Sequence, residues 1–280
     1  MKYKREDRTI SGGRKLYLYT FEESAKDWEK KQTYFWSAVA DTWRNRHEII
    51  ERRFEPVTKC MLEELGKGIG RLLDLGCGAC TIPYPESWEV YGVDLSHAMV
   101  KGRPKMVVGS LLALPFRNEV FERAFSRLAM MLVASPIVAF REVFRVLKKD
   151  GRFVFSVWGA REENLTQVTI SRILFPRAGL RMPSPFDPGP FRLSDPEEVR
   201  ALLQKVGFCD WKSQSIEMRY LAELSAREAV EAIIEMGGPF RTALERIEPS
   251  ERTKVLEEIE REVEKIDRTG KIIVWSAKKP

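Results

Sequence analysis

The segment Leu72–Ala79, with the sequence LLDLGCGA, limits the fold of this 280-residue chain more than any other feature. A short apolar run leads directly into Gly76 and Gly78, and glycines this close together let the backbone turn sharply and approach a ligand without an obstructing Cβ. Sixteen residues beyond Gly78, Asp94 ends a second apolar run, where its carboxylate can accept both hydroxyls of a ribose. This order of turn, strand and acid predicts a nucleoside-binding α/β domain.

Strand-like runs alternate with helical runs around this turn. The runs expected as strands are 71–75, 88–93, 105–108, 121–126 and 152–158, with a helix over 137–147 and two later strands over 208–221 and 271–277. Aromatic residues at helical spacing also predict helices within 25–65, the second of them from about Pro56 to Leu65. Such alternation predicts a largely parallel sheet covered on both faces. We expect an N-terminal basic arm with helices in 1–65, a core in 66–221 and 270–280, and a helical cap insertion in 222–269.

The residues after Gly78 restrict the kind of nucleoside. A dinucleotide site usually has a third glycine after the first two, with the pyrophosphate over a helix N-terminus. Here Cys80, Thr81, Ile82 and Pro83 follow instead. The ligand is therefore expected to carry no pyrophosphate, and S-adenosylmethionine, with a ribose, an adenine and an amino-acid tail but no phosphate, fits better.

Residues 71–158 resemble the class I S-adenosylmethionine-dependent methyltransferases, especially those of ubiquinone and menaquinone biosynthesis. LLDLGCGA resembles their first motif, VYGVDLSHAMV their second, VVGSLLALPF the segment that packs on adenine, and FREVFRVLKKDGRFVFSVW the helix, turn and strand that follow. The resemblance implies a Rossmann-like sheet, mostly parallel with an antiparallel last strand, S-adenosylmethionine as cofactor and methyltransferase activity.

Carried over by position, the resemblance also implies site residues. Those expected at the cofactor are Asp74, Gly76, Cys77 and Gly78 for its methionine end, Asp94 for the ribose, Leu95, Ser110, Leu111 and Leu112 for the adenine, and Trp43 over the ligand. Ser126, Arg127 and Leu128 are expected to border the transferred methyl group, with Ser126 and Arg127 as the catalytic candidates. Arg127 could equally be a salt-bridge partner, and Trp43 a core residue.

Two positions depart from the family pattern. Cys80 stands at the third glycine of the first motif, and Ser110 stands where relatives often carry an acid that accepts from the adenine amine. The connection from Gly78 to Trp88 is also too short for a normal first helix. We therefore expect the N-terminal region to close the cofactor pocket.

Other patterns set limits on the class of protein. The four cysteines include Cys77 and Cys80 as a C-x-x-C, but the second half of a zinc site is missing, so no metal is expected. The chain lacks an apolar run of about 18 residues and a signal peptide, which predicts a cytoplasmic protein outside the membrane, as a monomer or weak dimer. Four Gln and three Asn are few, as is typical of thermophilic proteins.

The acceptor of the methyl group stays open between two classes. Of the net charge of +6, residues 1–20 carry +4, and Tyr17, Tyr19, Phe21 and Tyr34 could stack on bases. These features favour an RNA base, such as an exocyclic amine of ribosomal or transfer RNA. The alternative is a quinone-like or lipid-like small molecule under the 222–269 cap. A third hypothesis is a non-catalytic cofactor-binding protein.

The sequence after the fourth strand bears on the amine hypothesis. An Asn/Asp/Ser-Pro-Pro-Tyr/Phe motif is typical of amine methylation there, but the chain reads Ser126-Arg127-Leu128-Ala129. Similar letters occur later, in 184–191, and we treat them as a coincidence unless that loop folds over the site.

Overall fold

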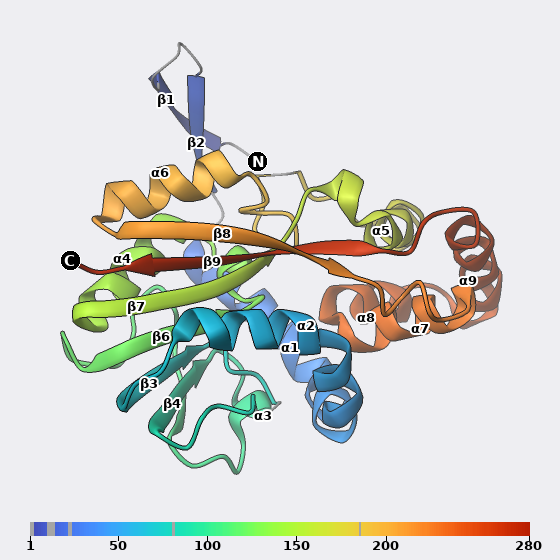
Figure 1. Ribbon diagram of the computed structural model, residues 1–280. Coiled ribbons are helices and arrows are strands. Elements are labelled where there is room, and N and C mark those ends of the chain that lie inside the picture. Colours follow the sequence, from blue (N-terminus) through green and yellow to red (C-terminus); the bar gives the residue numbers. More distant parts are fainter. Residues whose placement is uncertain (1–2, 10–14, 22–23, 80–81, 185) are drawn as a thin grey trace.

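A seven-stranded sheet forms the centre of the protein, whose computed structural model describes residues 3–9, 15–21, 24–79, 82–184 and 186–280 (Figure 1). Its strands are β3 (Gly70–Leu75), β4 (Trp88–Asp94), β5 (Met106–Val108), β6 (Phe121–Arg127), β7 (Leu147–Trp158), β8 (Cys209–Met218) and β9 (Gly270–Lys278). Their order in the sheet is β5-β4-β3-β6-β7-β9-β8. The strands from β5 to β7 pair in parallel, and β9 pairs antiparallel with both of its neighbours. The expected Rossmann-like sheet with an antiparallel last strand is confirmed.

Helices cover both faces of this sheet. The helices are α1 (Ala25–Asn45), α2 (His47–Leu65), α3 (His97–Val100), α4 (Pro136–Val146), α5 (Leu165–Arg177), α6 (Pro196–Val206), α7 (Ala226–Met236), α8 (Gly238–Glu245) and α9 (Pro249–Val263), with short 3₁₀ turns η1 (Met130–Leu132) and η2 (Arg161–Glu163). α2 packs on one face, and α4 and α6 pack on the other (Figure 1). A separate hairpin, β1 (Tyr3–Thr9) with β2 (Lys15–Phe21), extends away from the sheet.

The N-terminal helices differ from the expectation at one boundary. A helix was expected to begin near Pro56, but α2 begins at His47 and contains Pro56 in its interior. An interior proline removes a helical hydrogen bond. Ile50, Phe54 and Val57 are buried around it, and their packing offsets that loss. The chain breaks instead at Arg46, which leaves the helical conformation with φ −108° and ψ 16°.

Four helices gather at the carboxyl ends of the parallel strands. Trp158, which ends β7, pairs with Ile272 at the start of β9, so this end of the sheet is the one where α5, α7, α8 and α9 lie (Figure 1). The helices share an apolar core of their own, in which Ile170, Ala229 and Ile259 are fully buried. Within residues 222–269 the structure forms α7–α9, which pack on α5. Among the described helices, none combines the length and the apolar character that a bilayer crossing requires.

Candidate functional site

The turn after β3 is held tightly against the neighbouring strand ends. Gly76 and Gly78 adopt φ values of +69° and +52°, which glycine reaches without a steric penalty. The amides of Gly76 and Cys77 donate to the carbonyl of Val93 over 2.8 and 3.1 Å. A Cβ on Gly76 would lie 2.3 Å from the Cβ of Ala129. The turn therefore lies where β3 reverses the strand order, the usual ligand-binding crevice of such sheets.

The carboxylate of Asp94 is oriented by backbone amides. Gly78 donates to its Oδ2 over 3.0 Å, and Ser96 donates to its Oδ1 over 2.9 Å. Burial raises the pKa of Asp94, while these two amides and the nearby Arg103 counteract the rise. Each oxygen keeps a further lone-pair direction for a ligand. The arrangement can therefore accept two hydroxyl groups at once.

Asp74 supplies a second carboxyl group at the same strand ends. Its side chain is 2% exposed. Burial raises the pKa of Asp74 to about 6, although the cations of Arg103 and Arg127 oppose the rise. Because a buried carboxylate is stabilised by an opposite charge, this position favours a ligand that brings a cationic group.

A single cavity of about 800 Å³ opens above these groups. This volume lies high in the range of roughly 300–1,000 Å³ that is typical of ligand pockets. Its wall contains residues of the strand ends and the turn, namely Asp74, Gly76, Cys77, Gly78, Asp94, Leu95, Met99 and Leu111. The same wall contains six aromatic side chains, which we call the aromatic chamber: Phe54, Trp158, Phe175, Phe191, Tyr220 and Phe240. The cavity thus joins a polar strand-end site to an apolar chamber.

Helix α1 forms a wall of this cavity along much of its length. Trp28 donates its indole N–H to the carbonyl of Leu132 over 2.7 Å, and Trp43 donates to the carbonyl of Met236 over 2.8 Å. These two contacts tie α1 to η1 and to the end of α7. The described residues between Ala79 and β4 form no helix that could cover the pocket. The N-terminal region covers it instead, as expected. Trp43 lies in the wall.

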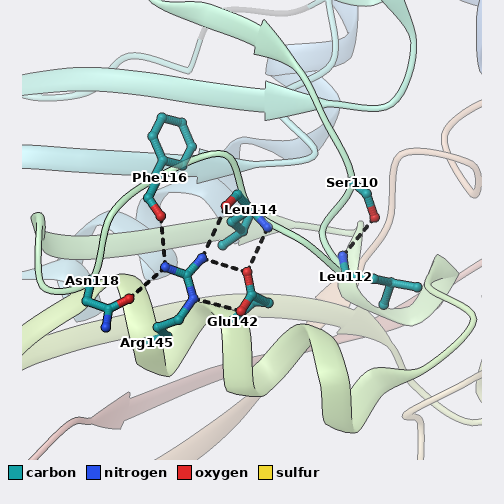
Figure 2. A network of polar contacts seen from close by, with 7 residues as sticks. All are labelled: Ser110, Leu112, Leu114, Phe116, Asn118, Glu142 and Arg145. Atoms are coloured by element: carbon teal, nitrogen blue, oxygen red, sulfur yellow. Dashed lines mark hydrogen bonds and ion pairs between the residues drawn. The ribbon is translucent and has the colours of Figure 1, made fainter.

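The loop after β5 brings Leu111 into the cavity wall. The Ser110 hydroxyl accepts from the amide of Leu112 over 2.9 Å (Figure 2). The same hydroxyl donates to the carboxylate of Glu29 on α1. Ser110 and Leu112, both expected at the adenine, are not among the wall residues. A carboxylate therefore stands beside Ser110 after all, supplied by α1.

Two residues of α4 form hydrogen bonds with the backbone of this loop. Glu142 accepts from the amide of Leu114 over 2.8 Å, and Arg145 donates to the carbonyl of Phe116 over 2.8 Å (Figure 2). A hydrogen bond from Arg145 lowers the pKa of Glu142, so the carboxylate stays ionised. The loop is thereby held in one conformation next to the cavity.

The two catalytic candidates are both engaged by the protein. Ser126 is fully buried, donates to the carbonyl of Leu75 over 2.9 Å and does not line the cavity. Arg127 does line it, but its guanidinium donates to both Glu51 oxygens and to the Thr58 hydroxyl. The hydrogen bond of Ser126 thereby joins β6 to β3, and those of Arg127 join β6 to α2.

Leu128 has an uncommon backbone conformation in the cavity wall. Its φ is +59°, and its amide lies 3.2 Å from both the carbonyl and the hydroxyl oxygen of Ser156. A non-glycine residue in this region is strained and persists only when its surroundings hold it there. Such strain is common at ligand sites, and here it lies next to the turn at Gly76.

Several wall residues were not expected from the sequence. Arg161 and Gln167 line the cavity, as do Ser184 and residues 187–191. The similar letters in this segment were treated as a coincidence, but Ser184 and residues 187–191 do lie at the cavity. The short connection from Gly78 to Trp88 and the helical spacing of aromatics in 25–65 were the signals for the α1 wall, and no local pattern marks Arg161 or Gln167. Cys80 lies outside the described residues.

The segment that contains the turn and the parallel strands is similar to a known family of sequences. Residues 73–155 match the family model described as a methyltransferase domain. The malonyl-[acyl-carrier protein] O-methyltransferase of Halorhodospira halophila is 33% identical over 128 residues, covering 41% of this chain and 42% of that protein. Squalene methyltransferase 1 of Botryococcus braunii is 30% identical over 104 residues, covering 31% and 28%. The chain spans less than half the length of these curated relatives.

Comparison with solved structures agrees on the fold. Phosphoethanolamine N-methyltransferase 2 of Haemonchus contortus, solved with phosphomonomethylethanolamine and S-adenosylhomocysteine, superposes with a TM-score of 0.57 and 16% identity. The match covers 95% of this chain and 62% of that one. At this identity the likeness concerns the fold alone.

Proposed function

This chain carries a class I S-adenosylmethionine-dependent methyltransferase domain, and we propose that it is an enzyme that methylates a small, largely apolar molecule. The observation that carries the proposal is the continuous cavity. Its wall combines carboxylates and glycines at the strand ends with the aromatic chamber. A donor and an acceptor bound side by side in one cavity are what a direct transfer needs.

The strand-end site fits an adenosyl ligand. Asp94 has one lone-pair direction free on each oxygen for the two ribose hydroxyls. Leu95, Met99 and Leu111 supply apolar surface for a flat ring. Asp74 supplies a buried carboxyl group for the ammonium of an amino-acid tail. These assignments follow the roles expected for Asp74, Asp94, Leu95 and Leu111.

The contribution of the protein to the reaction is to align the methyl donor with the acceptor. When bound, S-adenosylmethionine supplies a methyl group on a positively charged sulfur that leaves as a neutral thioether. The residues of the chain hold the two partners in line and exclude water, which can contribute several kcal/mol to the barrier reduction. Tyr220 in the aromatic chamber has its pKa raised to about 12 by burial, so it stays protonated and serves as a wall and not as a base.

The apolar lining supports a small molecule over RNA as the acceptor. The names of the two curated relatives refer to malonyl-[acyl-carrier protein] and to squalene, neither of which is a nucleic acid. The charge of residues 1–20 supports RNA only through a general attraction between a basic arm and a polyanion. The six aromatic side chains of the chamber instead match a ligand with an apolar body.

Transfer of tritiated methyl from S-adenosylmethionine tests the proposal. Extracts of cells that lack the protein are divided into an organic-soluble fraction and an RNA fraction, and each is incubated with enzyme and labelled cofactor. Label in the organic fraction is the expected result, and Asp94→Ala is the inactive control. Label in RNA alone contradicts the acceptor class, and a failure to bind S-adenosylhomocysteine in calorimetry contradicts the enzyme itself.

Removing residues 222–269 would not be a clean test of a cap. α7 and α9 share their apolar core with α5, where Ile170 and Leu174 are fully buried. Deletion would expose this surface and destabilise the whole end of the sheet. Single substitutions in the aromatic chamber are therefore the better probe.

A further inference from the structure

Gln167 on α5 lines the cavity, and its side chain has a buried hydrogen-bonding atom without a partner. Its side chain is 6% exposed, and its Oε1 has no hydrogen-bond partner among the described residues. A buried amide oxygen without a partner is destabilising, since it has lost its water and gained nothing in return. Glutamine is rare in this chain, which has only four of them, so a high abundance of glutamine does not explain the amide at this position.

Arg161 is a second polar group of the same wall without a full set of partners. Its guanidinium lies 5.3 Å from the ring centroid of Phe191 and donates to the carbonyl of Pro183. Its Nε is buried and has no acceptor. Across the described part of the chain, no carboxylate lies within ion-pair distance of Arg161. A cation in the wall is therefore left without an anion.

The other arginines of the cavity wall are in different situations. Arg127 is paired with Glu51, and Arg181 is paired with Asp187 over 2.7 Å. Arg246 is exposed to solvent, where its charge is hydrated. Arg161 alone, of these four, combines partial burial with the lack of a carboxylate.

The chemistry of the Arg161 guanidinium determines which ligand group would pair with it. The flat fork of a guanidinium binds the two oxygens of an oxyanion with parallel hydrogen bonds. One unpaired arginine balances one negative charge, whereas a phosphate monoester carries about −1.5 to −2 at neutral pH. A carboxylate therefore fits better than a phosphate. The surrounding chamber, with Phe175, Phe191 and Phe240, requires the rest of the ligand to be apolar.

We propose that the acceptor bound in the aromatic chamber is an apolar carboxylic acid, with its carboxylate held by Arg161. This inference rests on the proposed function, because it identifies the substrate class of that site. It concerns binding in the chamber and not the atom that receives the methyl group.

Binding of three probes with one shared alkyl chain tests the anchor. Laurate, lauryl alcohol and lauryl phosphate are titrated by calorimetry into the protein saturated with S-adenosylhomocysteine, below the concentration at which each forms micelles. We expect laurate to bind about 10- to 100-fold more tightly than the alcohol, the range of a charge-assisted hydrogen bond, and also more tightly than the phosphate. Equal affinity for acid and alcohol, tighter binding of the phosphate, or no binding of laurate would overturn the proposal.

Paired substitutions assign the preference to a residue. Arg161→Gln is expected to abolish the preference for laurate over the alcohol and to leave alcohol binding unchanged, and Arg161→Lys to restore part of it. Arg246→Gln, in the same wall but exposed, is the matched control and should keep the preference. Thermal unfolding of each variant checks that the Pro183 loop is intact. An equal loss of both probes in Arg161→Gln, or a loss of preference in Arg246→Gln, would contradict the anchor.

The failure of this inference is distinguishable from the failure of the proposed function. Calorimetry with S-adenosylhomocysteine alone reports on the strand-end site and does not involve Arg161. Normal cofactor binding without selective binding of laurate rejects the anchor and retains the methyltransferase. Absent cofactor binding rejects the methyltransferase, whatever the chamber binds.

Discussion

The carboxylate of Glu29 on α1 accepts a hydrogen bond from the hydroxyl of Ser110 in the loop after β5. These residues are 81 positions apart in the chain. Ser110 lies where related sequences often carry an acid, and Glu29 brings an acid to the same place from a different element. The contact links the N-terminal helix to the loop that presents Leu111 to the cavity.

Replacing Glu29 is therefore expected to weaken cofactor binding. Glu29→Ala removes the carboxylate beside the loop after β5. We expect about a 10- to 100-fold loss in affinity for S-adenosylhomocysteine, the range of one hydrogen bond to a charged group. Calorimetry measures this. Asp41→Ala, on the same helix with a side chain that is 91% exposed, is the control and should bind normally. Unchanged affinity in Glu29→Ala would exclude a role for this carboxylate.

Asp94→Ala is expected to have a larger effect. The substitution removes acceptors for two hydroxyl groups and also leaves the amides of Gly78 and Ser96 without their partner. The loss in affinity should be about 100-fold or more. Glu89→Ala is the matched control, because Glu89 lies on β4 as well but faces solvent and pairs with Lys105. Equal binding by both variants would show that the sugar is held elsewhere.

Cofactor affinity should depend on pH through Asp74. Burial raises the pKa of Asp74 to about 6, so this carboxyl group is protonated below that pH in the free protein. Only the ionised form attracts an ammonium group, and the affinity should therefore fall by up to about tenfold for each pH unit below 6. Titrations between pH 5 and about pH 8 measure the slope. Asp74→Asn should bind weakly with no such slope, and a slope that persists in this variant would assign the titration to another group.

The same carboxyl group should influence the stability of the free protein in the opposite sense. A folded-state pKa above the usual 3.8 means that the folded protein holds the proton more tightly than the unfolded chain. The resulting stabilisation is complete below about pH 4 and is lost as the pH rises through 6. The loss amounts to about 3 kcal/mol for a shift of this size. Urea unfolding of Asp74→Asn should lack this loss, and a wild-type profile in the variant would contradict it.

Two glycine substitutions in one turn should differ in cost. Gly76→Ala places a Cβ 2.3 Å from Ala129 and forces a positive φ on alanine, so we expect a loss of about 2–5 kcal/mol in the free energy of unfolding. Gly78→Ala has the positive φ but no neighbour within 4 Å, and should cost about 1–2 kcal/mol. Denaturant titration compares them. Equal losses would mean that the turn relaxes away from the segment after β6.

The central fold was predictable because its signals are local. The glycines at 76 and 78 and the acid at 94 are spaced by the geometry of a strand, a turn and a second strand, and they lie at the crevice as expected. The α2 boundary was not predictable from Pro56, because burial of Phe54 and Val57 outweighs the local preference of proline. Tertiary packing therefore determines where α2 begins.

The cavity wall around the aromatic chamber could not be predicted from local signals in the sequence. Phe54, Trp158, Gln167 and Phe240 come from four elements, and each looks like an ordinary core position in its own segment. Their shared role appears only when α5, α7 and α8 are assembled over the strand ends. Ser126 and Arg127 show the converse case, since their place in the motif is right but their side chains have partners within the protein.

The position of β9 has a consequence for how the chain can acquire its structure. β9 lies between β7 and β8, and β8 has no other strand beside it in the described sheet. Until residues 270–278 leave the ribosome, β8 therefore exposes both of its edges, and one edge of β7 stays open as well. Because β8 can pair only after β9 has been made, synthesis of the chain sets the earliest moment at which this side of the sheet can close.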